Sequence, residues 1–521
     1  MLLRPLLGLL LAVLVVHQHA RAAEGPLTTI TIHPTGRGDD EPVFMLPGQL
    51  RMRYIHLEDF ALDDLGTSHG QEDYGTMRVR LSPRFNLGKG WRIVLEGDFL
   101  DGIIAGDTTQ VGNGFLGRGD GGFRQDWLNR HSAIRVDGAE LRKAYVEWRS
   151  DIGLFRLGQM SSSWGMGLLA NGGDEPGSVF SDMRGGDLVE RFLYATQPLR
   201  LFMDDDLGKA LVVGLAGDLV YRDENASLID GDLAWQGVLS VSWRPGGWDL
   251  GVYVAWRSQT DRDGDSLEAV AIDVAGGIDQ KLGDLNLRAQ AEAVWVTGTT
   301  DRARFDGAPE TLDIASFGAA ALVGLGYPDA GLDASFEFGY ASGDNHRTDG
   351  TLRAFTFDAN HQVGMVLFED VLGRGSVRAL DRASDPGLSG EPPKGYEAIP
   401  TGGGITNVWY INPVIRYRPI SIIGLEAGLV WATTDAELSD AYATAANGGF
   451  NANSYGRPGA SGSLGVELDT GVALEMAVSD VIGFRVGAQC GVLFPGEALQ
   501  DANGSDLGEI VKVRVLADLV W

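Results

Sequence analysis

Segments in which apolar and polar residues alternate recur along this chain from residue 48 to residue 521. Successive side chains of a strand point to opposite faces, so each such segment has one apolar face and one polar face. In one of them, Trp91 and Ile93 alternate with Arg92 and Glu96. No stretch shows sustained helical periodicity, and glycine supplies 74 of the 521 residues, as expected of a chain with many tight turns. The pattern predicts an all-β fold.

The alternation predicts eighteen strands. They cover residues 48–58, 75–86, 90–101, 138–150, 153–161, 187–198, 209–222, 232–244, 247–258, 267–280, 284–297, 313–327, 331–342, 404–418, 421–433, 464–479, 481–494 and 508–521. Sixteen is the alternative count, because 187–198 and 209–222 are weak segments joined by a charged stretch. With either even number of strands, both ends of the strand array lie on the same side of the membrane, the periplasmic side.

The connections between these strands alternate in length. Short turns lie at 87–90, 150–153, 244–247, 282–284, 327–331 and 418–421, and long stretches lie at 102–137, 162–186, 298–312, 343–403 and 434–463. Outer-membrane barrels have short periplasmic turns and long extracellular loops, whereas a soluble sandwich gives no reason for this alternation. We therefore expect an antiparallel transmembrane β-barrel of about eighteen strands.

The two ends of the chain agree with export to a membrane. Arg4 precedes an apolar run at residues 5–16, and Ala20 and Ala22 form the small-x-small pattern of a signal-peptidase site. The expected organisation is a signal peptide at 1–22, a periplasmic N-terminal segment at 23–47 and the barrel at 48–521. Trp521 ends the last strand, as in barrels whose aromatic residues lie at the membrane interface. The expected location is the outer membrane of a Gram-negative bacterium, with outer-membrane lipid, lipopolysaccharide and the barrel assembly machinery as partners.

If the apolar faces point to lipid, the residues that point inward are determined. The inward basic residues are Arg51, Arg53, Arg78, Arg80, Arg84, Arg92, Lys143, Arg149, Arg156, Lys512 and Arg514. The inward acidic residues are Asp273, Glu292, Asp333, Glu337, Glu426, Glu467, Asp469 and Glu475. In an eighteen-strand ring the two sets face each other, and the resulting field would orient polar solutes. The open alternative is that these charges are solvated, or paired with neighbours such as Glu96, Asp98 and Glu147.

The longest loop, at 343–403, contains an apolar segment at residues 361–372. Such a segment would be an unfavourable patch if it were exposed outside the cell. We expect it to fold into the barrel as a constriction or plug, or else to pack against the rim or add a strand pair. The loop at 162–186 is a second candidate for an inward fold.

Other site chemistry is sparse in this sequence. One hairpin loop carries Asp261, Asp263, Asp265 and Glu268, an oxygen-rich pattern, but Ser266 stands where a calcium-binding EF-hand loop requires glycine. Weakly bound Ca²⁺ is therefore the one cofactor considered, and solvated turn residues are the default. We expect no enzyme activity, because the sequence has no Gly-x-Ser-x-Gly, His-Glu-x-x-His or phosphate-loop motif. The net charge of −29 argues against nucleic acid as a partner.

Several segments resemble those of uncharacterised outer-membrane barrel proteins from myxobacteria, namely 156–174, 187–191, 361–372 and 406–413. This resemblance implies a fold and a location only. In architecture the chain is similar to eighteen-stranded alginate-export and carboxylate-uptake porins, which also carry basic ladders. We therefore expect a porin-like channel for small or extended polar and anionic solutes. The alternative is a non-conducting barrel that serves as a surface scaffold or as an adhesion or binding component.

Overall fold

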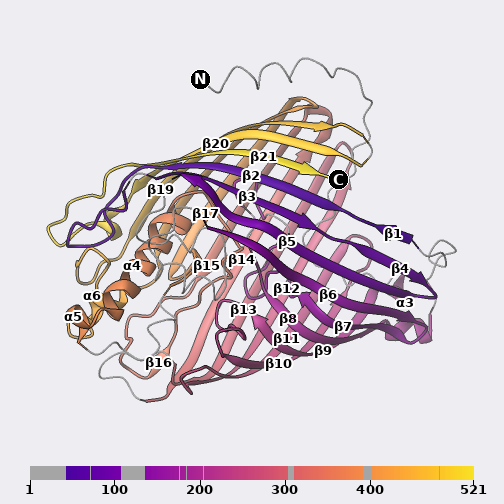
Figure 1. Cartoon of the computed structure of the whole chain (residues 1–521), viewed down its shortest axis with the longest axis horizontal. Helices are drawn as coiled ribbons and strands as arrows, with labels where there is room; N and C mark the ends of the chain where they lie inside the picture. The colour runs from indigo at the N-terminus through magenta and orange to yellow at the C-terminus, as the bar shows by residue number, and fades with distance from the viewer. Residues whose placement is uncertain are drawn as a thin grey trace.

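The computed structural model describes residues 43–70, 72–106, 135–174, 177–182, 185–203, 205–302, 310–390, 400–479 and 481–521. The predicted signal peptide and residues 23–42 lie outside these ranges. Within them, eighteen strands form one closed antiparallel barrel (Figure 1). No helix among the described residues is both long enough and apolar enough to span a membrane.

The strands follow one another around the ring in chain order. They are β2 (Gly48–Leu57), β3 (Glu72–Leu81), β5 (Trp91–Gly106), β6 (Arg135–Ser150), β7 (Gly153–Ser161), β8 (Leu188–Thr196), β9 (Leu211–Arg222), β10 (Leu233–Trp243), β11 (Trp248–Thr260), β12 (Ser266–Leu282), β13 (Leu285–Thr300), β14 (Leu312–Tyr327), β15 (Leu332–Ala341), β17 (Val408–Ile420), β18 (Ile423–Thr434), β19 (Ser463–Ala477), β20 (Gly483–Pro495) and β21 (Ile510–Val520). The ring closes where β21 pairs with β2, in a register that sets Val520 opposite Gln49 and Lys512 opposite Leu57. A closed ring leaves no unpaired strand edge, which allows strands to cross hydrocarbon.

The predicted all-β barrel of eighteen strands is confirmed. The two weak segments, 187–198 and 209–222, form β8 and β9, so the alternative count of sixteen is wrong. The predicted strand at 75–86 is divided into β3 and β4 (Arg84–Gly88), which both pair with β5. The division falls at Pro83, which has no backbone N–H to donate to a neighbouring strand. A short strand, β1 (Val43–Met45), pairs with β4.

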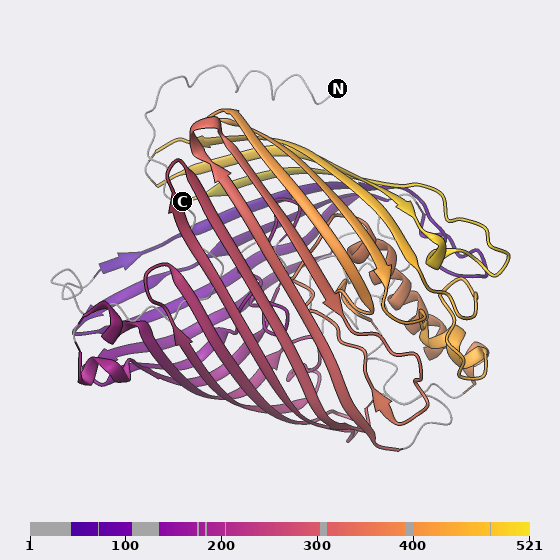
Figure 2. The same cartoon turned by 180° about the vertical axis from the view of Figure 1, so that it is seen from behind.

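The six short turns that the sequence predicts lie at the same end of the barrel as the start of β2 and the end of β21, and we call this the turn end (Figure 2). The turn before β5 needs glycine, because Gly90 has a φ of 79° and an added Cβ would lie 2.3 Å from the carbonyl oxygen of Arg149. The connection from β8 to β9 is longer and holds η2 (Pro198–Leu201) and α3 (Asp206–Ala210). The η3 turn (Pro328–Ala330) joins β14 to β15.

The outward face of the barrel is apolar. On β13, Trp295 is 62% exposed on the outside, while the adjacent Val294 is fully buried. Trp243 on β10 and Trp256 on β11 are likewise exposed, and Trp521 is exposed at the turn end. Large apolar side chains in such a belt contact lipid in a membrane barrel. The outer surface therefore has the alternation that the sequence predicts.

The long connections lie at the opposite end, the loop end, and carry most of the helices. The helices at the loop end are η4 (Leu367–Leu372), α4 (Gly373–Ser384), α5 (Pro386–Ser389), α6 (Ala441–Ala446) and η6 (Glu497–Leu499). Figure 1 shows α4, α5 and α6 grouped there. A two-residue strand, β16 (Thr351–Leu352), pairs in parallel with β14.

The largest hydrophobic cluster lies inside the barrel. Leu168 and Phe180 from the loop at 162–186 pack there with Phe357 and Val366 from the loop at 343–403, against wall residues such as Val430. Both loops therefore fold inward. For the apolar segment at 361–372 this confirms the inward fold, while β16 of the same loop pairs with β14 and its helices α4 and α5 lie at the loop end.

Candidate functional site

Asp182 of the first inward loop (residues 162–186) binds the basic wall. Its Oδ1 lies 3.0 Å from Nη1 of Arg51 and 3.1 Å from Nη2 of Arg53. Arg514 on β21 donates to the carbonyl oxygen of Phe180 at 2.6 Å. Burial acts to raise the pKa of Asp182, but the nearby guanidiniums of Arg51, Arg53 and Arg514 outweigh it and hold that pKa well below its usual range. Breaking buried ion pairs costs about 3–5 kcal/mol, so these contacts hold the loop firmly where β2 meets β21.

The same loop also binds the acidic wall. Glu292 on β13 accepts the backbone N–H groups of Met166 and Leu168, the second at 3.1 Å. The ring of Trp164 packs on that of Tyr253, with centroids 5.3 Å apart. Because β13 lies across the ring from β2, the first inward loop crosses the interior and contacts both walls.

A buried ionic cluster fixes the loop's middle to β3, β5 and β6. Asp174 lies 3.1 Å from Nη2 of Arg142 and 2.8 Å from Nζ of Lys143. Arg80 binds Asp98 at 2.7 Å on the neighbouring strand. Burial opposes ionisation of Asp174, yet Lys143 and Arg142 hold its pKa well below the usual range.

Arg142 is a site residue that the sequence analysis missed. The register of β5 against β6 shifts between Glu96 and Gly97, so Arg142 and Lys143 both have buried or half-buried side chains in contact with Glu96. A β-bulge inserts one residue and breaks strict alternation. The alternation alone assigns Arg142 to the outer face, which is wrong.

The second inward loop (residues 343–403) is held by backbone and charged contacts. Glu467 on β19 accepts the N–H groups of Met365, Val366 and Leu367, the last two at 2.8 Å. Lys512 on β21 lies 2.7 Å from Oδ2 of Asp370. These contacts again join an acidic strand and a basic strand through one loop.

Two further buried residues, Arg374 and His361, hold this loop. Arg374 lies 3.0 Å from Asp370 and 3.1 Å from Glu72 on β3. His361 lies 3.0 Å from Glu337, which also accepts the hydroxyl of Tyr410 at 2.6 Å.

The structure places the predicted inward residues in two groups along the barrel axis. Those nearer the loop end or the middle contact the inward loops or other charged groups, and they include Arg51, Arg53, Arg80, Lys143, Lys512, Arg514, Glu292, Glu337 and Glu467. Arg78, Asp273 and Asp469 are also buried. Those nearer the turn end are Arg84, Arg92, Arg149, Arg156, Asp333, Glu426 and Glu475. In the loop half, then, the space between the two walls holds the inward loops, and a passage-lining role for these residues stays a prediction.

Near the turn end, three arginines share one carboxylate, and we call them the arginine triad. Arg149 and Arg156 each place Nε 2.8 Å from Glu147, and Nη1 of Arg92 lies 3.8 Å from it. Glu147 is 1% exposed, whereas the three guanidinium-bearing side chains keep 13–27% of their surface exposed. Three cations on one anion leave an excess of two positive charges on this part of the inner wall.

The predicted weak calcium loop forms a hairpin turn at the loop end. Oδ1 of Asp261 accepts the N–H groups of Asp263 at 3.1 Å and Asp265 at 2.9 Å, which is a turn-forming arrangement. Glu268 accepts the hydroxyl of Ser258. Calcium binding at this loop stays a prediction.

Comparisons with known proteins find no matching family model and no matching curated protein. Among solved structures, OccAB2 of Acinetobacter baumannii has a TM-score of 0.49 at 11% identity, over 91% of this chain and 98% of that chain. OccK9 (OpdG) of Pseudomonas aeruginosa has a TM-score of 0.49 at 10% identity, with the same coverage. OpdK of Pseudomonas aeruginosa, solved with vanillate, has a TM-score of 0.45 at 12% identity, over 91% and 98% of the two chains.

Proposed function

We propose that this chain is a porin-like channel of the bacterial outer membrane that passes small or extended polar and anionic solutes. The observation that carries the proposal is the arginine triad, where three part-exposed guanidiniums on β5, β6 and β7 surround the single buried carboxylate of Glu147. Charged rings on a pore wall select ions of the opposite sign. The triad lies beyond the two inward loops, where a solute that has passed the constriction would meet it.

A second group of charges on the other side of the closing seam supports the same polarity. Arg416, Arg418 and Arg485 surround Glu426 and Glu475 near the turn ends of β17 to β20. Nη2 of Arg418 lies 2.9 Å from Glu475, and Nη2 of Arg485 lies 3.0 Å from Glu426. Three cations and two anions leave one further positive charge. This acidic chain thus carries local positive excess on parts of its inner wall.

The remaining features of the proposal follow from the fold and the sequence. A closed ring with an apolar outer belt requires a lipid environment, for which we propose the outer membrane with lipopolysaccharide as a neighbour and the barrel assembly machinery as the insertion partner. The proposed cargo is a small polar solute. We propose no catalytic step and no nucleic-acid partner.

The hydrophobic cluster inside the barrel favours a second candidate function. Phe357, Val366 and Leu367 pack against wall residues such as Val430 and Leu493, as in a folded core. A barrel closed by such a core would not conduct. Its outer loops would then act as a scaffold or a binding surface.

Solute flux into proteoliposomes distinguishes charge selection from simple sieving. We compare potassium gluconate, with valinomycin to carry the counterion, and sorbitol, which is also a six-carbon polyol but lacks the carboxylate. Faster swelling in gluconate is expected because the excess positive charge raises the local anion concentration. Equal rates for the two solutes would contradict the anion preference, and no swelling in either would favour the scaffold.

A further inference from the structure

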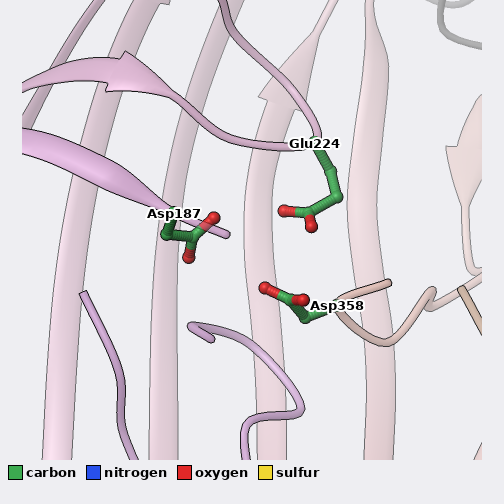
Figure 3. A group of neighbouring side chains, drawn as sticks. All are labelled: Asp187, Glu224 and Asp358. Carbon is green, nitrogen blue, oxygen red and sulfur yellow. The ribbon is translucent and has the colours of Figure 1, made fainter. Parts of the chain in front are cut away.

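Three carboxylates from three distant segments converge near the loop end of β8 and β9. Asp187 immediately precedes β8, Glu224 follows β9, and Asp358 belongs to the second inward loop. Their carboxylate oxygens lie within 4.8 Å of one another, and Figure 3 shows the three side chains pointing toward a common space. Among the described residues, no other group of three or more His, Cys, Asp or Glu side chains converges in this way.

Two of these carboxylates are buried and have an oxygen without a hydrogen-bond partner. Asp187 is 7% exposed and Asp358 is 3% exposed. Oδ2 of Asp187 accepts the N–H of Asn171, and Oδ1 of Asp358 accepts that of Asn360. Within the part of the chain that the structure describes, Oδ1 of Asp187 and Oδ2 of Asp358 have no such donor. A buried charged oxygen without a partner costs free energy unless a ligand satisfies it.

The neighbouring guanidinium of Arg257 compensates this charge only in part. Arg257 acts electrostatically on Asp187 and Glu224, but its own donors bind Asp223, at 3.2 Å, and Gln259, at 2.9 Å. Burial, and then the neighbouring carboxylates, raise the pKa of Asp187 and that of Asp358 well above the usual range. Ionised together, the three groups therefore require a cation between them.

We propose that Asp187, Glu224 and Asp358 bind one Ca²⁺ ion. Ca²⁺ takes oxygen ligands at about 2.3–2.6 Å, so two ligands on opposite sides of it are at most about 5 Å apart. The observed spread of oxygens fits within that limit. Mg²⁺ dehydrates reluctantly and usually keeps several waters, so a site made of three protein carboxylates favours Ca²⁺.

Calcium at this position would join both inward loops to the barrel rim. The two loops already touch here, because the N–H of Asp358 donates to Leu168 at 2.9 Å and the side chain of Asn360 donates to Gly185 at 3.2 Å. Glu224 lies at the rim, just after β9, and its Oε1 lies 3.4 Å from the backbone nitrogen of Ala359 in the second inward loop. The ion would therefore fix the constriction in place, whatever solute the barrel passes.

Calcium binding to the purified, EDTA-treated protein in detergent tests this proposal. We expect the wild type to bind about one more Ca²⁺ per chain than Glu224→Gln does, because a hard divalent ion needs the lost charge. Glu224 is exposed, so this variant should fold, and Asp187→Asn with Asp358→Asn gives the stronger loss. The matched control, Glu310→Gln, removes an exposed carboxylate just before β14 and should bind calcium like the wild type.

The thermal midpoint provides a second readout. CaCl₂ should raise it for the wild type and for Glu310→Gln but not for Glu224→Gln, because a ligand of the native state stabilises that state. Equal calcium binding by wild type and Glu224→Gln would overturn the site. An equal shift with MgCl₂ at the same concentration would overturn the assignment to calcium.

Discussion

Replacing residues 359–403 with a short Gly–Ser link is expected to raise single-channel conductance in planar bilayers several-fold. These residues make up most of the second inward loop, whose Val366 and Leu367 lie in the core inside the barrel. The deletion can close without strain, because Thr356 pairs with Thr406 and the N–H of Phe357 donates to Ile405 at 2.9 Å. Removing side chains from the lumen widens the path for ions.

The control for this deletion shortens the hairpin loop at residues 261–265, which lies at the rim. Arg262 and Asp263 are exposed there, so the conductance should stay at the wild-type value. Both proteins must keep the heat-modifiable gel mobility of a folded barrel. An unchanged conductance in a folded deletion variant would show that ions do not pass where the second inward loop lies.

Neutralising two members of the arginine triad is expected to reduce the anion preference of the channel strongly, leaving only the single excess charge of the group around Glu426 and Glu475. Arg92→Gln with Arg156→Gln leaves Arg149 paired with Glu147 at 2.8 Å, so the excess falls from two positive charges to none. Glu147→Gln changes the excess in the other direction, to three. A change of about 1.4 kcal/mol in the free energy of an ion corresponds to about a tenfold change in permeability ratio.

The reversal potential under a KCl gradient measures this effect. The double variant should shift it toward that of a nonselective pore, and Glu147→Gln should shift it toward chloride. Arg262→Gln, at the rim hairpin, is the matched single-charge control and should have little effect. Shifts of the same sign in the double variant and in Glu147→Gln would contradict an electrostatic role for the triad.

The sequence predicts the wall of this barrel better than its contents. Alternation placed β7 at residues 153–161, the bounds that the structure has, because Gly153 and Ser161 border a regular segment. It failed at Arg142, where a bulge shifts the register, and at Pro83, where one predicted strand is divided. A period of two carries no information about where a residue has been inserted.

Prediction from the sequence has a similar limit for the two inward loops. The apolar segment 361–372 predicted an inward fold as one of three alternatives, since its exposure would be unfavourable. The contacts that hold the loops could not be predicted, because Asp182 lies 131 residues from Arg51 and Met365 lies 102 residues from Glu467. Asp187, Glu224 and Asp358 likewise come together only in the folded chain.

Single-channel recording of the purified wild-type protein in planar bilayers tests the proposed function most directly. The proposal predicts discrete, ohmic conductance steps with a reversal potential that favours anions, because the triad has an excess of positive charge beyond the constriction. A silent bilayer, with protein that is shown to be folded and inserted, would contradict a channel and leave the scaffold.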